Sequence, residues 1–208
     1  MSKLQISALP NGQWRQNCYV LSGEGPQAIV IDPGSDAEMI QKHLDENQLE
    51  PLAILNTHAH YDHIGAVADL VDRYRIPFYL HAGDEKILKQ ANLYKILFES
   101  KKSVRIPAHF EDLASLPTAL KISNFSFEVL YSPGHTPGGV CFLFEQSLFS
   151  GDTLMPNGPG RTDLPGGDKQ ALNHSVDNLR NLSSKTIIYP GHGKPLSLEK
   201  FWGLTCHV

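Results

Sequence analysis

The chain has 208 residues, of which 41% are hydrophobic and 19% are charged, a composition typical of a globular protein with a large core. The 18 lysine and arginine residues are balanced by 22 aspartate and glutamate residues without a basic run, which argues against nucleic acid or a membrane surface as partner. The three cysteines form no C-x-x-C pair, and no segment resembles a signal peptide or a membrane span. We therefore expect a reduced, cytoplasmic protein with one domain, residues 1–208, in which Cys18 and Cys141 are buried hydrophobes.

Apolar periodicity and turn residues predict a series of strands and helices. Apolar runs, alternating or continuous, predict strands at 4–9, 18–21, 28–31, 52–56, 77–81, 119–122, 125–131, 139–145, 147–150 and 186–189. Apolar residues at helical spacing predict helices after Asp36 and at 64–74, 83–98, 168–181 and 197–202. Residues 101–112 form a polar loop that could shape access to a site. The two halves each begin with strands, which fits two sheets packed face to face with helices outside.

Residues 57–63, with the sequence THAHYDH, combine three histidines and an aspartate directly after a predicted strand. In an extended turn, residues two apart point the same way, so His58 and His60 can aim at one point. Asp62 and His63 lie where the chain bends into the following helix and can aim at a neighbouring point. Neutral imidazole and carboxylate suit zinc, iron or manganese, and four such groups at this spacing predict a metal site.

Three further candidate ligands follow predicted strands and lie among small residues. They are His135 in the sequence SPGHTPGG, Asp152 in SGDT and His192 in PGHG. A strand fixes the position of each side chain, and the neighbouring glycines allow backbone turns that a Cβ atom would forbid. Five histidines and two aspartates exceed the three or four protein ligands of one tetrahedral zinc ion, so the set predicts two metal ions.

The seven candidates divide into two sets and a bridge. The first metal is assigned to His58, His60 and His135, and the second to Asp62, His63 and His192. Asp152 is the expected bridge, because a carboxylate has two oxygens to share. Two metals of this kind hold a hydroxide that attacks an acyl or phosphoryl centre, with Asp62 and Asp152 as the catalytic residues that orient it. Zinc is the favoured ion, with iron and manganese as alternatives.

The motifs resemble those of the metallo-β-lactamase fold superfamily, and within it the glyoxalase II (hydroxyacylglutathione hydrolase) branch in its short, single-domain form. The likeness extends from residue 57 to residue 193, through THAHYDH, GHT, SGDT and PGHG in this order. It implies an α/β fold in which two mixed β-sheets form a four-layer αββα sandwich with the metals at one edge. It also implies hydrolysis of a small-molecule thioester such as S-lactoylglutathione, whose thiol, with a pKa of about 8.5, leaves without strong acid help.

Two other hydrolase branches of the superfamily differ at single positions. β-Lactamases of this fold often carry cysteine at the Asp152 position and do not use the His63 position as a ligand, which argues against that activity. Lactonases place a tyrosine three residues after the bridging aspartate, where this chain has Met155. A lactone or other ester nevertheless stays open as an alternative substrate.

Persulfide dioxygenase is the main alternative to the thioester hydrolase. These enzymes share the start of the segment GRTDLPGGD at residues 160–168 and hold a single iron through the equivalents of His58, His135 and Asp152. A non-catalytic role is disfavoured, because a scaffold that has lost its activity usually loses ligands and all seven are present here.

Arg161 is the candidate substrate-binding residue. In glyoxalase II a basic residue nine positions after the bridging aspartate contacts a carboxylate of glutathione, and Arg161 stands at that spacing. The planar guanidinium of arginine can bind a carboxylate through two hydrogen bonds. Alternatively, Arg161 is an ordinary surface residue or forms an ion pair with Asp163. The chain departs from that family at Asp163, where the family has an aromatic residue, and after His192, where a tyrosine is missing. We also expect no C-terminal helical domain after Val208, so the thiol carrier stays open.

Overall fold

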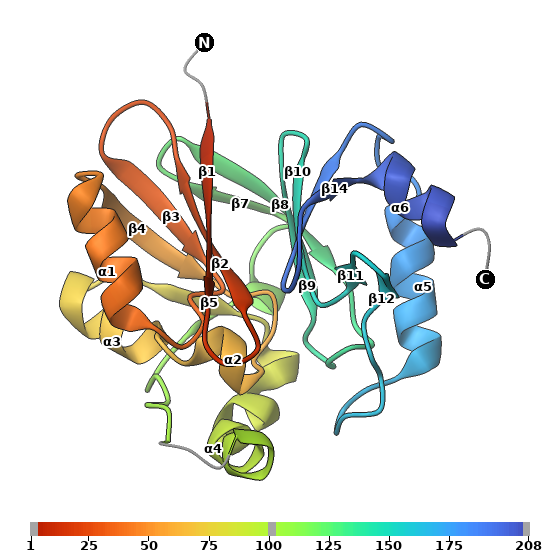
Figure 1. Ribbon diagram of the computed structural model, residues 1–208, viewed down its shortest axis with the longest axis horizontal. Helices are drawn as coiled ribbons and strands as arrows, with labels where there is room; N and C mark the ends of the chain where they lie inside the picture. Colours follow the sequence, from red (N-terminus) through yellow and green to blue (C-terminus); the bar gives the residue numbers. More distant parts are fainter. Residues whose placement is uncertain (1–3, 100–102, 206–208) are drawn as a thin grey trace.

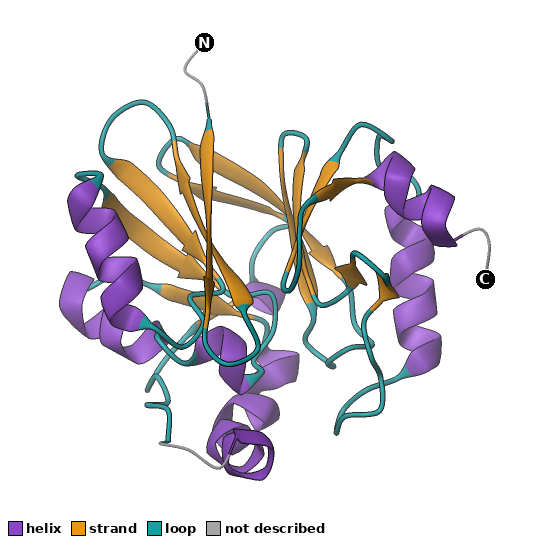
Figure 2. Ribbon diagram, in the orientation of Figure 1, coloured by secondary structure: helices purple, strands orange, loops and turns teal. Residues whose placement is uncertain are grey.

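Two β-sheets lie face to face between two layers of helices in the computed structural model, which describes residues 4–99 and 103–205 (Figure 1). Each of the two sheets has six strands. Helices α1 and α3 lie outside the first sheet, and α5 and α6 lie outside the second (Figure 2). This arrangement confirms the four-layer αββα sandwich that the sequence predicts.

The first sheet contains the strands of the N-terminal half in chain order. They are β1 (Gln5–Asn11), β2 (Gln16–Ser22), β3 (Gln27–Ile31), β4 (Glu50–Leu55), β5 (Phe78–Leu80) and β6 (Glu111–Asp112). The first three pair antiparallel, and β3 to β6 pair parallel. Parallel pairing needs crossover connections, and helices supply them here.

The second sheet contains the strands of the C-terminal half in the order β14-β13-β10-β9-β8-β7. These are β7 (Ala119–Ile122), β8 (Phe125–Tyr131), β9 (Val140–Phe144), β10 (Ser147–Gly151), β13 (Ile187–Pro190) and β14 (Leu196–Ser197). A small hairpin of β11 (Leu154–Met155) and β12 (Gly158–Pro159) follows β10. The strands β6, β11, β12 and β14 have two residues each, too short to show any alternation in the sequence, and they were not predicted.

The helices agree with the prediction except around the histidine motif. They are α1 (Ala37–Glu46), α2 (Tyr61–Ile64), α3 (Val67–Tyr74), α4 (Glu85–Glu99), α5 (Lys169–Leu179) and α6 (Leu198–Thr205). The helix predicted at 64–74 begins earlier, at Tyr61, and is divided between α2 and α3. The division is caused by Gly34, whose N–H donates to the carbonyl of His63 at 3.1 Å and whose carbonyl accepts from the N–H of Ala66 at 2.6 Å. The His63 carbonyl and the Ala66 N–H therefore bond to Gly34 instead of to groups within a continuous helix.

Buried side chains of the first sheet alternate between two cores. In β2, Cys18 and Val20 contribute to the core beneath the helices, and Tyr19 and Leu21 contribute to the core between the sheets. A third core lies between the second sheet and helices α5 and α6. Cys18 and Cys141 are fully buried, as predicted.

The predicted polar loop extends from α4 to β6. Residues 101 and 102 lie outside the described part of the chain. In the remainder, 103–112, the backbone of Val104 bonds to the side chain of Asn92 on α4. Among the described residues, no helix is both long and apolar enough to cross a membrane.

Candidate metal centre

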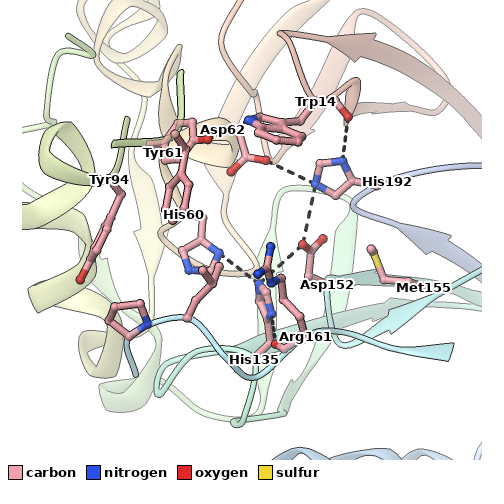
Figure 3. Close-up of a pocket in the computed structure, with 13 residues that line it drawn as sticks. Trp14, His60, Tyr61, Asp62, Tyr94, His135, Asp152, Met155, Arg161 and His192 are labelled. Carbon is pink, nitrogen blue, oxygen red and sulfur yellow. Dashed lines mark hydrogen bonds and ion pairs between the residues drawn. The ribbon is translucent and has the colours of Figure 1, made fainter. Parts of the chain in front are cut away.

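The seven predicted ligands come from four segments that meet at one edge of the sandwich. His58 and His60 follow β4, and Asp62 and His63 lie in the short helix α2. The other three, His135, Asp152 and His192, follow β8, β10 and β13. Five of the seven are drawn in Figure 3, where they face a common cavity. The strand ends thus bring together residues up to 134 positions apart (192 − 58).

His58, His60 and His135 converge on one point. Nε2 of His58 lies 3.1 Å from Nδ1 of His60, and Nε2 of His135 lies 3.0 Å from the same atom. All three nitrogens lie within 4.8 Å of one another. Zinc–nitrogen bonds of about 2.0–2.1 Å in a tetrahedron separate two ligand atoms by roughly 3.3 Å, so this group fits such an ion.

Asp62, His63 and His192 form a second group. Oδ2 of Asp62 lies 3.3 Å from Nε2 of His192 and 3.9 Å from Nε2 of His63, and the three ligand atoms lie within 4.8 Å of one another. Nε2 of His63 is buried and has no hydrogen-bond partner among the described residues. Buried polar atoms are rarely left without a partner, so this nitrogen also fits a metal ion.

The Asp152 carboxylate lies between the two groups. Its Oδ2 is 3.5 Å from Nε2 of His135 in the first group and 3.7 Å from Nε2 of His192 in the second. Its Oδ1 is 3.6 Å from Nε2 of His63 and, within the described structure, makes no hydrogen bond. One carboxylate therefore reaches both groups.

Four of the five histidines direct Nδ1 to an oxygen atom and Nε2 to another of the candidate ligands. The Nδ1 contacts are His58 to Thr57 Oγ1 at 3.0 Å, His63 to Asp32 Oδ2 at 3.0 Å, His135 to the Arg161 carbonyl at 2.7 Å, and His192 to the Trp14 carbonyl at 3.1 Å. A ring that donates from Nδ1 keeps Nε2 unprotonated and correctly oriented for a metal. The donor set therefore fits two divalent cations in chemistry as well as in spacing.

Asp32, at the end of β3, supports the ligands and was missed in the sequence. Its Oδ1 accepts from the Thr57 N–H at 2.7 Å, and its Oδ2 accepts from the Thr57 hydroxyl at 2.6 Å and from Nδ1 of His63 at 3.0 Å. Asp32, His58 and His63 also form a group of closely spaced donor atoms. Because both Asp32 oxygens already accept these bonds, we assign it to positioning His63. The sequence Asp-Pro-Gly by itself indicates only a turn.

Asp84 is a second supporting residue that the sequence did not reveal. Its side chain is fully buried, Oδ2 accepts from the N–H of Ala59 at 2.9 Å, and Oδ1 accepts from the N–H of Gly138 at 2.6 Å. Ala59 lies between two ligands of the first group, and Gly138 lies three residues after the third. One carboxylate thus joins the loop that follows β4 to the loop that follows β8.

Burial and carboxylates shift the histidine pKa values in opposite directions. Burial lowers the pKa of His60 to about 3, so this ring is neutral at physiological pH. Burial also disfavours the charged form of His63, but Asp62 and other carboxylates outweigh it and raise the pKa of His63 to about 9. The pKa of His192 is raised as well, because its hydrogen bond with Asp62 and the neighbouring carboxylates outweigh burial. The second group therefore favours positive charge, which a metal cation supplies when it displaces the protons.

Gly191 allows the segment before His192 to approach the bridging carboxylate. A Cβ atom at this position would lie 2.2 Å from Oδ1 of Asp152 and 2.7 Å from Cε1 of His63. No real Cβ atom comes so close to neighbouring atoms, so glycine is required here for close approach rather than for a turn.

A cavity of about 250 Å³ opens above the ligands (Figure 3). Its walls are largely aromatic and apolar, formed by Trp14, Tyr61, Tyr94, Phe98, Leu164 and Pro165. The indole N–H of Trp14 donates to the Tyr61 hydroxyl at 2.7 Å, which joins the β1–β2 turn to α2. None of the described residues 103–112 lines the cavity, so the predicted role of this loop in access gains no support from them.

Arg161 lines the cavity, but its side chain already has a partner. Its Nε donates to Oδ1 of Asp163 and its Nη2 donates to Oδ2, both at 2.7 Å, which is the ion pair given as an alternative above. Both partners are exposed, and exposed ion pairs exchange readily with solvent or with other anions. The backbone carbonyl of Arg161 has a separate role, because it accepts from His135.

The profile of the metallo-beta-lactamase superfamily matches residues 11–192, and the chain belongs to this superfamily, as a metallo-hydrolase. It is 36% identical over 189 residues to the probable metallo-hydrolase YqgX of Bacillus subtilis, covering 89% of this chain and 88% of that protein. It is 34% identical over 203 residues to the hydroxyacylglutathione hydrolase GloC of Haemophilus influenzae, covering 91% of each.

Solved structures confirm the fold. A crystal structure of the BLEG-1 B3 metallo-beta-lactamase superposes with a TM-score of 0.88 at 38% identity and covers 94% of this chain and 95% of that one. The di-iron-bound form of TTHA1623 superposes with a TM-score of 0.84 at 36% identity, covering 93% of this chain and 96% of that one. A β-lactamase is thus among the similar structures, although the sequence argued against that activity.

Proposed function

We propose that the protein is a dinuclear metal-dependent hydrolase that cleaves a thioester such as S-lactoylglutathione. This proposal depends above all on the position of the Asp152 carboxylate between two groups of candidate ligand atoms. Its Oδ2 contacts His135 in one group and His192 in the other. Similarity to the hydroxyacylglutathione hydrolase GloC supports a glutathione-linked substrate. The proposal treats residues 1–208 as one domain.

In this proposal all seven residues bind metal, with zinc as the favoured ion. One ion is held by His58, His60 and His135, the other by Asp62, His63 and His192, and Asp152 binds both. Iron also fits a set of imidazoles and carboxylates, and the similar structure of TTHA1623 contains two iron ions.

A pair of divalent cations supplies a nucleophile from water near neutral pH and polarises the carbonyl of the substrate. The protein supplies the orientation. Asp62 and Asp152 are the two carboxylates among the described residues that line the cavity, where they would hold and direct the attacking water. Asp32 holds the His63 ring through Nδ1, so that its Nε2 stays directed at the centre. The thiol leaves as thiolate, so the site needs no separate general acid.

Arg161 is the proposed contact for a carboxylate of the thiol carrier. Its exposed pair with Asp163 holds the guanidinium at the mouth of the cavity, and a substrate carboxylate would exchange with Asp163.

The test measures metal content and activity on the same sample, purified without added metal. We expect about two metal ions per chain, together with hydrolysis of S-lactoylglutathione. Replacing a ligand in His192→Ala should reduce both. The control is His81→Ala, which removes a histidine that stacks on Tyr131 and belongs to neither ligand group.

Two other results would replace the proposal. One iron per chain, no thioester turnover, and oxygen consumption with glutathione persulfide would indicate a persulfide dioxygenase. Turnover of nitrocefin without thioester turnover would indicate a β-lactamase, the activity named for the similar BLEG-1 structure.

A further inference from the structure

The cavity above the metal ligands is walled by large apolar side chains that face solvent. Trp14 is 49% exposed and Phe98 is 45% exposed, although both line the cavity. Tyr94 and Phe98 lie one turn apart on α4, so both reach the same side of the cavity. Large apolar surface left in water at the mouth of a site is a common mark of ligand binding.

The apolar wall is assembled from three separate segments. Trp14 lies in the turn between β1 and β2, Tyr94 and Phe98 lie on α4, and Leu164 lies in the segment between β12 and α5. The Trp14 ring is held in place by its hydrogen bond to the Tyr61 hydroxyl. A small polar acyl group such as lactoyl would leave most of this wall in contact with water.

Charges on the described wall are few. Apart from the ligand residues, Arg161 is the one charged residue among those described that line the cavity, and both arms of its fork bond to Asp163. An adjoining cleft is different: it shares Asp152, Arg161 and His192 with the cavity, but it also contains Lys194, an exposed residue for which the described structure provides no ion pair. An anionic group is better accommodated in that cleft than against the aromatic wall.

Building on the hydrolase function proposed above, we infer that the acyl group of the substrate is apolar, and aromatic by preference. It lies between Trp14 and α4, and the anionic thiol carrier extends along the cleft beside Lys194. Hydrolysis then forms a bond between the oxygen of water and the acyl carbon and breaks the carbon–sulfur bond. The sulfur leaves as thiolate and takes up one of the two protons of the water in solution, so the products are an aromatic carboxylic acid and a thiol.

The experiment compares two thioesters that share the carrier and the 2-hydroxyacyl group. S-mandeloylglutathione differs from S-lactoylglutathione only by a phenyl group in place of methyl. We expect kcat/KM for the mandeloyl substrate to exceed that for the lactoyl substrate by about tenfold or more, because each methylene buried in an apolar pocket changes kcat/KM by roughly 10-fold or more.

A matched pair of variants on α4 locates the preference. Phe98→Ala removes an aromatic wall residue, whereas Leu97→Ala removes an apolar side chain that is 65% exposed and does not line the cavity. Phe98→Ala should reduce the mandeloyl-to-lactoyl ratio of kcat/KM to about a third or less, because the phenyl group loses a contact that the methyl group of lactoyl is too small to make. Leu97→Ala should leave this ratio unchanged. Far-UV circular dichroism confirms that both variants are folded.

The outcomes separate this inference from the proposed function. If the lactoyl substrate is turned over as fast as the mandeloyl substrate or faster, the inferred preference for an apolar acyl group is wrong, but the proposed hydrolase function is unaffected. An equal loss for both substrates in Phe98→Ala overturns the role of the wall. No turnover of either thioester by protein containing two metal ions overturns the hydrolase, and this inference with it.

Discussion

Replacing Asp84 should weaken both the fold and the first metal group. The carboxylate accepts the N–H of Ala59 at 2.9 Å and the N–H of Gly138 at 2.6 Å in a fully buried position. Asp84→Ala leaves both donors without a partner, and each buried unpaired donor costs roughly 1–3 kcal/mol, or about 2–6 kcal/mol for the two. Burial raises the pKa of the Asp84 carboxyl, so the native side chain itself carries a desolvation cost that the variant relieves. We therefore expect the loss of unfolding free energy to fall in the lower half of that range, about 2–4 kcal/mol.

The loss is measured by urea unfolding of the metal-free protein, and metal affinity is measured by competition with a chelator. The loop that carries His58 and His60 would no longer be joined to the loop that carries His135, so the ion held by these three residues should be lost first. Asp84→Asn keeps one acceptor oxygen and should show an intermediate loss.

Asp112 provides the control, because it makes the same kind of bonds at the surface. Its Oδ1 accepts from the N–H of Ala82 and the N–H of Ala114, both at 2.9 Å and both exposed to solvent. Water can replace this acceptor, so Asp112→Ala should lose less than about 1 kcal/mol. An Asp84→Ala protein that matches Asp112→Ala in stability and keeps both metal ions would refute the role assigned to Asp84.

Three further predictions concern other positions. Gly191→Ala would push a Cβ atom against the Asp152 carboxylate and should abolish metal binding by that residue, as measured by elemental analysis. The control is Gly203→Ala on α6, where nothing lies within 4 Å of the added carbon. This control should keep its metal content, and its unfolding free energy should rise by up to about 1 kcal/mol in thermal unfolding. Asp32→Asn removes the carboxylate acceptor of His63 and should lower metal affinity by about 10–100-fold, with an unchanged value by chelator titration counting against the assignment. Burial raises the pKa of Cys141 to about 11 and that of Cys18 above its ordinary value, so at pH 8 neither should react with a disulfide reagent until urea is added, as mapped by mass spectrometry of the labelled peptides.

The predicted elements and ligands depended on local patterns. Alternation in the strand at 125–131 and helical spacing at 168–181 reflect side chains that face one core, so they are visible along the chain and agree with β8 and α5. The histidine motif was readable because its ligands are neighbours in sequence. The division of the following helix into α2 and α3 could not be predicted, because it depends on hydrogen bonds to Gly34, which lies far away in the chain.

The sequence by itself determined which imidazole and carboxylate groups the chain can offer to a metal, because these depend only on residue types and their order. Only the tertiary structure decided how those donors are held. Asp32 and Asp84 carry no local signal, since their partners lie 25 residues or more away and come together only when the strand ends meet. The same is true of the aromatic wall: Trp14 and Phe98 are unremarkable in the sequence, and they form one surface because the β1–β2 turn and α4 flank the same cavity.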